Sequence, residues 1–267
     1  MDHDPFAELK KRQREMWASF GPTATSTTPV AAHLVRFAAI TPGESVLDVA
    51  TGTGVVAITA ARAGASVKAL DLTPELLAQA HDNAQIAGHE EIEWTEGDAE
   101  QLPYADASFD VVLSQFGHMF APRPELAMSE MRRVLKPGGR IAFATWPPEH
   151  LVGRMFAFVG RNSPPPPAGS SPPPQWGNPG LISERLGARF DAPFFERGFM
   201  AYPALSLSHY RLSMERTIGP LQKLVERLAS EPEKLAALRH EYEVMAAGYY
   251  EGNVVRQDYL LTRARAV

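Results

Sequence analysis

The chain contains 267 residues, of which 45% are hydrophobic and 21% are charged, and it carries a formal net charge of −5. This composition is typical of a globular enzyme, and the length allows one large domain or one domain with a sizeable insertion. The negative net charge excludes a field that would gather nucleic acid. The absence of cysteine excludes disulfides, thiolate metal sites and a cysteine nucleophile.

Residues 1–40 are predicted to form an N-terminal helical lid. An amphipathic pattern over 5–20 predicts one helix, and a proline in the first turn of the next predicts a second helix over 30–39. The basic run 10–14 is interpreted as a solvated helix face rather than an arm that contacts RNA. The sequence shows neither a signal-peptide core nor a run of about 20 apolar residues, so we expect a cytoplasmic protein without membrane contact.

A glycine turn joins the first predicted strand to a helix. The apolar run Val46–Val49 predicts a buried strand, which passes through Thr51-Gly52-Thr53-Gly54 into a helix. Glycines let the backbone turn sharply and approach a ligand, and a helix N-terminus directs unpaired N–H groups at it. Because the spacing Gly52-x-Gly54-x-x-Ala57 also fits a dinucleotide fingerprint, this turn alone does not decide between nucleotide cofactors.

Four further strands are predicted before residue 146, alternating with helices that begin near Thr73 and Glu125. Residues 136–139 are interpreted as a turn that ends the second of these helices. Alternating strands and helices predict a parallel sheet that is covered on both faces. The predicted strands are 66–70, 92–95, 109–113 and 140–145.

Polar side chains follow each of the first four strands, whose carboxyl ends share the ligand-binding edge of a parallel sheet. Asp48 lies at the end of the first strand, and Asp71 follows the second, where a carboxylate can accept the hydroxyls of a ribose. Asp98 follows the third, where it can accept an adenine amine, and Gln115 follows the fourth. Taken singly, the two later aspartates could instead cap strand ends, and the glutamine could be a polar core residue.

Five stretches, in this order and spacing, resemble class I S-adenosylmethionine-dependent methyltransferases of the ubiquinone/menaquinone-biosynthesis-like type. They are VLDVATGTG (46–54), ALDLTPELL (69–77), EGDAEQLPY (96–104), FDVVLSQFGHMF (109–120) and RVLKPGGRIAFATW (133–146). The resemblance implies a cofactor-binding core over residues 41–146. It also implies an α/β, Rossmann-like fold with a seven-stranded, mostly parallel sheet and helices on both faces.

The resemblance further implies which residues hold S-adenosylmethionine, which leaves as S-adenosylhomocysteine. The two glycines of the turn would lie against its methionine and ribose parts, and Asp48 would order the loop and the amino group. Ala50 stands where the family carries a glycine, a substitution that such loops tolerate. The implied cofactor-binding residues are Asp48, Ala50, Thr51, Gly52, Gly54, Asp71, Leu72, Asp98, Ala99 and Gln115.

Residues 147–252 are predicted to form a Pro-rich connection and a helical substrate cap with one late strand. Seven prolines between 163 and 174 exclude a helix or strand interior there. Residues 253–267 are predicted to be the final strand of the core sheet. Helices are expected over 151–160, 214–229 and 233–249.

We therefore predict a monomeric or homodimeric enzyme, without a metal, that transfers a methyl group to a small, partly apolar metabolite by direct displacement. The acceptor atom stays open between oxygen, nitrogen and carbon. His118 is the candidate general base, with His150 and His209 as weaker candidates. The expected walls of the substrate pocket are Trp17, Phe20, Met119, Phe120, Trp146, Met155 and Trp176.

Two other functions fit the same sequence. An NAD(P)-dependent oxidoreductase would use the same glycine turn, but the chain has no recognisable Tyr-x-x-x-Lys pair. A non-catalytic S-adenosylmethionine-binding partner subunit would keep the turn and lack turnover. Methylation of nucleic-acid amines is disfavoured, because those enzymes carry an Asp/Asn-Pro-Pro-aromatic motif where this chain has Ser114-Gln115-Phe116-Gly117.

Overall fold

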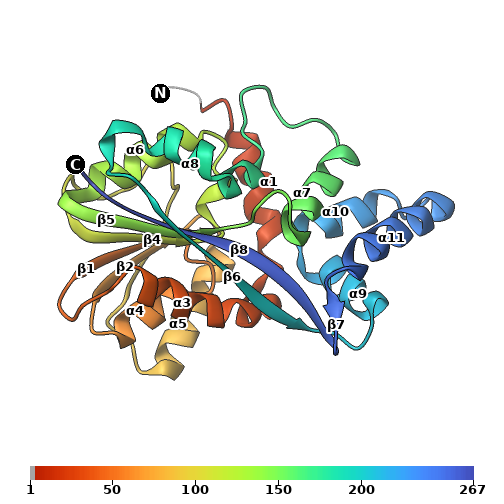
Figure 1. Ribbon diagram of the computed structural model, residues 1–267, viewed down its shortest axis with the longest axis horizontal. Coiled ribbons are helices and arrows are strands. Elements are labelled where there is room, and N and C mark those ends of the chain that lie inside the picture. The colour runs from red at the N-terminus through yellow and green to blue at the C-terminus, as the bar shows by residue number, and fades with distance from the viewer. Residues whose placement is uncertain (1–3) are drawn as a thin grey trace.

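The computed structural model describes residues 4–267 and is built around one sheet (Figure 1). Seven strands follow the order β3-β2-β1-β4-β5-β8-β6, and a short β7 pairs with β8 off this path. The strands are β1 (Ser45–Val49), β2 (Ser66–Asp71), β3 (Glu93–Glu96), β4 (Phe109–Gln115), β5 (Leu135–Thr145), β6 (Phe194–Pro203), β7 (Tyr250–Glu251) and β8 (Val254–Arg265).

The strands β1 to β5 run parallel, whereas β8 is antiparallel to both β5 and β6. The chain therefore leaves the sheet after β5, forms the first part of the cap, returns as β6, and forms the rest of the cap before it returns as β8. This arrangement confirms the predicted Rossmann-like α/β fold with a mostly parallel sheet. It also places the carboxyl ends of β1 to β5 at the edge that faces the cap.

Helices cover both faces of the sheet and form the cap. Figure 1 shows α3, α4 and α5 on one side of the sheet, α6 and α8 on the other, and α7, α9, α10 and α11 beyond its end. The helices are α1 (Ala7–Trp17), α2 (Gly21–Ala24), α3 (Thr28–Phe37), α4 (Val55–Arg62), α5 (Pro74–Ala87), α6 (Pro124–Val134), α7 (Leu151–Arg161), α8 (Pro179–Leu186), α9 (Leu207–Thr217), α10 (Gly219–Arg227) and α11 (Pro232–Ala247).

One apolar core runs without a break from the sheet into the cap. The side chains of Phe143 on β5, Phe158 on α7 and Tyr242 on α11 are all fully buried. The Pro-rich segment reaches this core through the short 3-10 helix Pro173–Gly177, which carries the fully buried Trp176. The cap is therefore packed onto the sheet rather than tethered beside it.

Several boundaries differ from the sequence predictions. Residues 136–139 lie inside β5, where the pairing register with β4 shifts, so they form a bulge in a strand rather than a turn before one. The helix predicted over 214–229 is divided into α9 and α10, because Pro220 has no backbone donor to continue the first helix. The short helix α8 was not predicted from the sequence.

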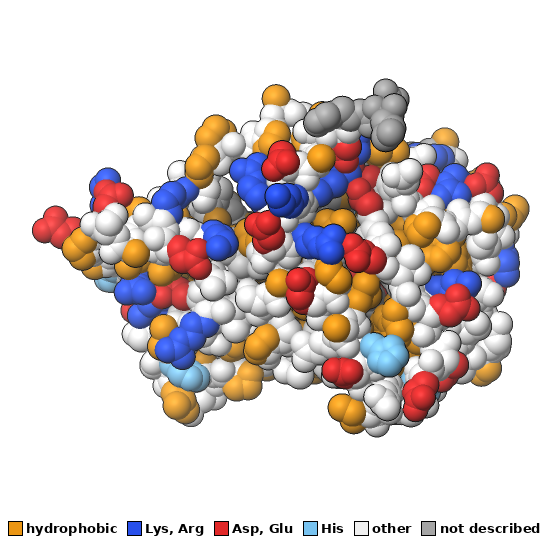
Figure 2. Space-filling view, turned by 180° about the vertical axis from the view of Figure 1, so that it is seen from behind, with side chains coloured by type: hydrophobic (Ala, Val, Ile, Leu, Met, Phe, Trp, Pro, Cys, Tyr) orange, Lys and Arg blue, Asp and Glu red, His pale blue; other side chains and the backbone are white. Residues whose placement is uncertain are grey.

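The described surface carries mixed charge. On the face shown in Figure 2, acidic and basic side chains are interspersed rather than gathered by sign. A face of this kind provides no single-sign field for collecting nucleic acid. Within residues 4–267, no helix has both the length and the apolar character needed to cross a bilayer.

Candidate functional site

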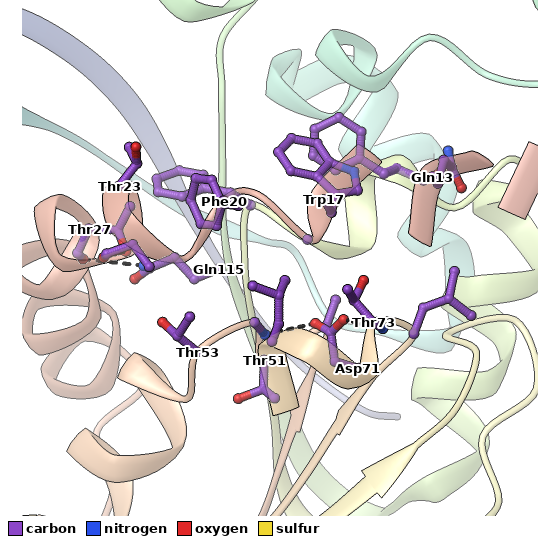
Figure 3. Close-up of a pocket in the computed structure, with 18 of the residues that line it drawn as sticks. Gln13, Trp17, Phe20, Thr23, Thr27, Thr51, Thr53, Asp71, Thr73 and Gln115 are labelled. Carbon is purple, nitrogen blue, oxygen red and sulfur yellow. Dashed lines mark hydrogen bonds between the residues drawn. The ribbon is translucent and has the colours of Figure 1, made fainter. Parts of the chain in front are cut away.

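A cavity opens at the carboxyl ends of the parallel strands, between the sheet, the N-terminal segment and the cap. Figure 3 shows Trp17 and Phe20 on one side of this cavity and Thr51, Asp71 and Thr73 on the other. Most residues of the sequence-predicted site line it: Asp48, Ala50, Thr51, Gly52, Asp71, Leu72, Asp98, Ala99, Gln115, Trp17, Phe20, Phe120, Trp146 and Met155. Gly54, His118, Met119 and Trp176 are not among the lining residues.

The two glycines of the turn have different tasks. Both adopt left-handed backbone angles, with φ of 56° at Gly52 and 81° at Gly54, which side chains resist. A Cβ added to Gly52 would project into open space, and Gly52 lines the cavity. A Cβ added to Gly54 would lie 2.7 Å from the ring of Trp94. Gly52 therefore leaves room for a ligand, whereas Gly54 allows α4 to begin against its neighbours.

Asp48 presents an unpaired buried oxygen. Its side chain is 0% exposed, and Oδ2 accepts hydrogen bonds from Thr51 Oγ1 at 2.5 Å and from the Ala57 N–H at 3.1 Å. Oδ1 has no partner among residues 4–267. Burial raises the pKa of Asp48 to about 7, although the two hydrogen bonds act in the opposite direction. A cationic amino group would satisfy both the free oxygen and the buried charge.

Asp71 ties the glycine turn to the end of β2. Its Oδ2 accepts a hydrogen bond from the Gly52 N–H at 2.7 Å, drawn as a dashed line in Figure 3, and Oδ1 accepts one from the Thr73 N–H at 2.8 Å. Burial raises the pKa of this carboxyl as well. Each oxygen keeps one lone pair, so the carboxylate can still accept hydroxyl donors from a ligand in the cavity.

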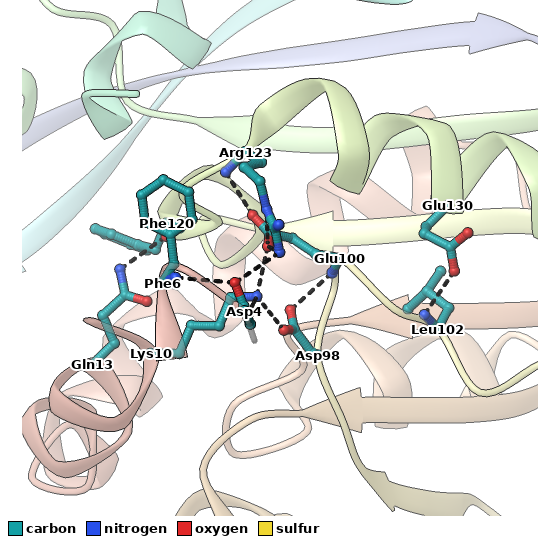
Figure 4. Close-up of polar contacts among 10 residues, drawn as sticks. All are labelled: Asp4, Phe6, Lys10, Gln13, Asp98, Glu100, Leu102, Phe120, Arg123 and Glu130. Atoms are coloured by element: carbon teal, nitrogen blue, oxygen red, sulfur yellow. Dashed lines mark hydrogen bonds and ion pairs between the residues drawn. The ribbon is translucent and has the colours of Figure 1, made fainter. Parts of the chain in front are cut away.

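Asp98 is held by an ion-pair cluster that also fixes α1 (Figure 4). Lys10 Nζ lies 2.6 Å from Asp98 Oδ2, 2.6 Å from Glu100 Oε2 and 2.7 Å from Asp4 Oδ2. Arg123 lies 2.6 Å from the same Glu100 oxygen. The three carboxylates are close enough together to suit a metal ion, but the lysine ammonium already lies among them. The cluster therefore joins the N-terminal segment to the end of β3.

Gln115 lies where β4 ends and faces the cavity. Its Nε2 donates a hydrogen bond to the backbone oxygen of Thr27 at 3.2 Å, as drawn in Figure 3. Its Oε1 is buried without a hydrogen-bond partner in the described part of the chain. The side chain is thus oriented by the N-terminal segment and keeps an acceptor for a ligand.

The cavity wall also contains aromatic and methionine side chains. Phe116 and Trp146 stack with ring centroids 3.7 Å apart, and α7 contributes Phe156. Several wall residues were not predicted from the sequence. Most of them come from the late strands and the cap, far along the chain from the glycine turn, whereas Phe116 directly follows β4. The unpredicted wall residues include Phe116, Val152, Met200, Tyr202, Tyr210, Met214, Ile218 and Gln257.

The structure does not support His118 as a general base. The side chain is 0% exposed and packs between Phe143 and Trp176, with 4.7 Å between ring centroids in each pair. Burial lowers its pKa to about 3, and neither ring nitrogen has a partner within residues 4–267. The short 3-10 helix His118–Phe120 turns its first two residues into the core and Phe120 toward the cavity.

The other predicted bases and two predicted wall residues also lie elsewhere. No histidine of the described chain lines the cavity, which removes His150 and His209 from consideration there. Met119 and Trp176 are buried in the core instead of lining the pocket. Large apolar side chains near a ligand site serve the core first, and these two do so.

Comparisons with known proteins agree with this geometry. A family model described as a methyltransferase domain matches residues 47–143. An uncharacterized protein of Mycobacterium tuberculosis is 35% identical over 256 residues, which cover 94% of this chain and 93% of that protein. The ubiquinone/menaquinone biosynthesis C-methyltransferase UbiE of Rubrivivax gelatinosus is 44% identical over 108 residues, which cover 40% of this chain and 41% of that protein.

A solved structure shares the fold over most of the chain. A candidate methyltransferase from Bacillus halodurans C-125 superposes with a TM-score of 0.58 at 25% identity, covering 88% of this chain and 97% of that one. Fold and site thus define a Rossmann-like methyltransferase. The chain belongs to the class I S-adenosylmethionine-dependent methyltransferases, as its motifs predicted, and this membership sets the oxidoreductase alternative aside.

Proposed function

We propose that this enzyme transfers the methyl group of S-adenosylmethionine to a small, partly apolar metabolite. One observation carries the proposal: Asp48, Gly52, Asp71 and Asp98, which come from three strand ends, line the same cavity as the aromatic wall. The polar edge suits an adenosyl amino acid, and the wall suits the apolar body of an acceptor. Asp48 holds the amino group, Asp71 the ribose hydroxyls, and Asp98 with Ala99 the adenine.

Direct displacement needs little covalent help from the protein. When bound, S-adenosylmethionine supplies a methyl carbon on a positively charged sulfur. An electron pair of the acceptor bonds to this carbon as the C–S bond breaks, and the electrons of the C–S bond stay on sulfur. The protein aligns the two reactants and excludes water, which in well-oriented systems lowers a barrier by up to about 7–11 kcal/mol. The N-terminal segment and the cap provide this enclosure.

Among residues 4–267, no histidine lines the cavity to serve the acceptor as a base. Its carboxylates lie at the strand ends that we assign to the cofactor, and burial raises the pKa of the wall tyrosine Tyr210 to about 12. We infer that the acceptor enters with a lone pair already available, and that any proton it loses after transfer passes to water.

Calorimetric titration tests the cofactor assignment. We expect S-adenosylhomocysteine to bind, and NAD⁺ and NADP⁺ to show no heat at the same concentrations. Binding of a nicotinamide cofactor alone would overturn the proposal. Transfer of a labelled methyl group to a panel of phenols, amines and quinols then separates the enzyme from a non-catalytic partner subunit, for which every acceptor would stay unlabelled.

A matched pair of glycine variants tests where the cofactor lies. Gly52 and Gly138 both have left-handed φ angles, and in both an added Cβ meets no atom within 4 Å, but only Gly52 lines the cavity. We expect Gly52→Ala to weaken S-adenosylhomocysteine binding at least tenfold, about 1.4 kcal/mol, and Gly138→Ala to leave it unchanged. Equal effects would show that backbone strain, not contact with a ligand, explains the loss.

A further inference from the structure

A buried polar pair forms part of the cavity wall. Tyr210 on α9 is 1% exposed and Gln257 on β8 is 4% exposed, and both line the cavity. Gln257 Nε2 donates a hydrogen bond to the Tyr210 hydroxyl at 2.7 Å. The residues that we assign to the cofactor come from the ends of β1 to β4. The pair on α9 and β8 therefore has no role in cofactor binding as proposed above.

Packing holds the pair in one orientation. The Tyr210 ring stacks on Tyr242 with centroids 6.1 Å apart and meets Tyr202 edge-on at 5.4 Å. Gln257 is paired in register with Met200 of β6, so the sheet fixes its backbone. Because the amide nitrogen is engaged by the tyrosine, the carbonyl oxygen Oε1 has a set direction. No residue between 4 and 267 donates a hydrogen bond to that oxygen.

The charges around the cavity are concentrated away from this pair. Among residues 4–267, the charged side chains that line it are Lys10 and Arg14 on α1 and three aspartates at the ends of β1 to β3. Both cations are already paired, Lys10 with Asp98 at 2.6 Å and Arg14 with Glu96 at 2.7 Å. A charged acceptor beside Gln257 would therefore lose hydration without gaining a counter-charge.

We propose that Gln257 and Tyr210 are the acceptor-positioning residues of this enzyme. The acceptor is uncharged and mainly apolar, and it carries one hydroxyl or N–H that donates a hydrogen bond to Gln257 Oε1. Tyr210 acts through Gln257 by holding its amide nitrogen. The apolar body of the acceptor lies against Trp146, Met200 and Met214. This inference rests on the proposed methyl transfer and adds to it the substrate class and the residues that recognise it.

Four matched probes test the inference by titration into protein saturated with S-adenosylhomocysteine: p-cresol, p-xylene, 4-hydroxybenzoate and 4-hydroxybenzylamine. The last two add a negative or a positive charge to the phenol. We expect p-cresol to bind at least tenfold more tightly than either charged probe. Gln257→Leu should lower the affinity for p-cresol about tenfold and change the affinity for p-xylene by less than twofold, because only the phenol donates a hydrogen bond to Oε1. Tyr210→Phe should lower the affinity for p-cresol several-fold.

Controls separate this inference from the cofactor assignment. Gln85→Leu, at an exposed position on α5, should change the affinity for neither p-cresol nor p-xylene. Every variant should keep its affinity for S-adenosylhomocysteine, which also shows that the variant is folded. Gln257→Met replaces the leucine variant if the latter fails to fold. The inference is overturned if p-cresol does not bind, if a charged probe binds as tightly, or if Gln257→Leu weakens p-xylene equally. Failure of the wild-type protein to bind S-adenosylhomocysteine would instead overturn the proposed function.

Discussion

At the scale of single residues, the raised pKa of the buried Asp48 makes binding of a cationic ligand depend on pH. With a pKa of about 7 in the unliganded protein, its carboxyl is partly protonated at neutral pH. A cationic amino group beside the free Oδ1 favours the ionised form. Binding therefore requires loss of this proton, and affinity falls as the pH drops below the pKa.

We expect S-adenosylhomocysteine affinity to fall by up to tenfold for each pH unit below about 7, and to level off above it. Calorimetry between pH 5 and 8 measures this slope, and proton release appears as a dependence of the heat on the buffer. Asp48→Asn should bind more weakly and lose the slope. A slope that persists in Asp48→Asn would assign the titration to another group.

Burial shifts the pKa of His118 in the opposite direction from that of Asp48, downward. Its folded-state pKa of about 3 lies below the ordinary value of 6.5, so the unfolded chain binds more protons between these limits. Through His118 the free energy of unfolding is therefore unaffected by pH above about 6.5 and decreases as the pH falls toward 3, by at most about 1.4 kcal/mol per pH unit.

We expect the His118→Leu variant to lose less stability than the wild-type protein as the pH falls from 7 to 5, and to retain its methyltransferase activity. At pH 7 the free energy of unfolding should stay equal or rise by about 1 kcal/mol, since two unpaired buried nitrogens are removed. Urea unfolding at pH 7 and pH 5 measures both effects. Loss of turnover with intact S-adenosylhomocysteine binding would restore His118 as a base.

At the scale of elements, α1 is fixed to the cofactor edge by Lys10, which is 7% exposed. Removing one member of a buried ion cluster leaves the others uncompensated. We expect Lys10→Met to lower the free energy of unfolding by about 1–3 kcal/mol and to speed amide exchange in residues 7–17. Lys11→Met, at an exposed neighbouring position, is the control. Equal exchange in the two variants would show that the cluster does not hold the helix.

Local chemistry explains which elements the sequence could predict. Apolar runs, proline starts and glycine stops gave the alternation of strands and helices up to β5, because each signal lies within a few residues. The bulge at residues 136–139 and the break at Pro220 were missed, since a bulge depends on pairing with β4 and a helix can begin anew after a proline. The short α8 has no long periodic pattern.

The same distinction holds for the candidate site. Parallel strands bring Asp48, Asp71 and Asp98 to one edge whatever the cap does, so their convergence could be predicted from topology. The pairing of Tyr210 with Gln257 joins segments 47 residues apart through tertiary packing, which no local pattern encodes. The inward direction of His118 depends on one short turn, and sequence alone does not fix it.

At the scale of the whole molecule, the continuous core predicts that sheet and cap unfold together. We expect one calorimetric transition, which S-adenosylhomocysteine at 100 times its Kd stabilises by about 2.7 kcal/mol as a single unit. Differential scanning calorimetry with and without the ligand measures this. Two transitions, of which only one moves with ligand, would mean that the cap unfolds independently of the sheet.

A crystal structure of the protein with S-adenosylhomocysteine would show directly whether the cofactor binds at the ends of β1 to β3. We expect the ligand's amino group at hydrogen-bond distance from Asp48, its ribose hydroxyls on Asp71, and its adenine beside Asp98 and Ala99. A ligand bound in another hollow, or one whose ribose lies away from Asp71, would contradict this expectation.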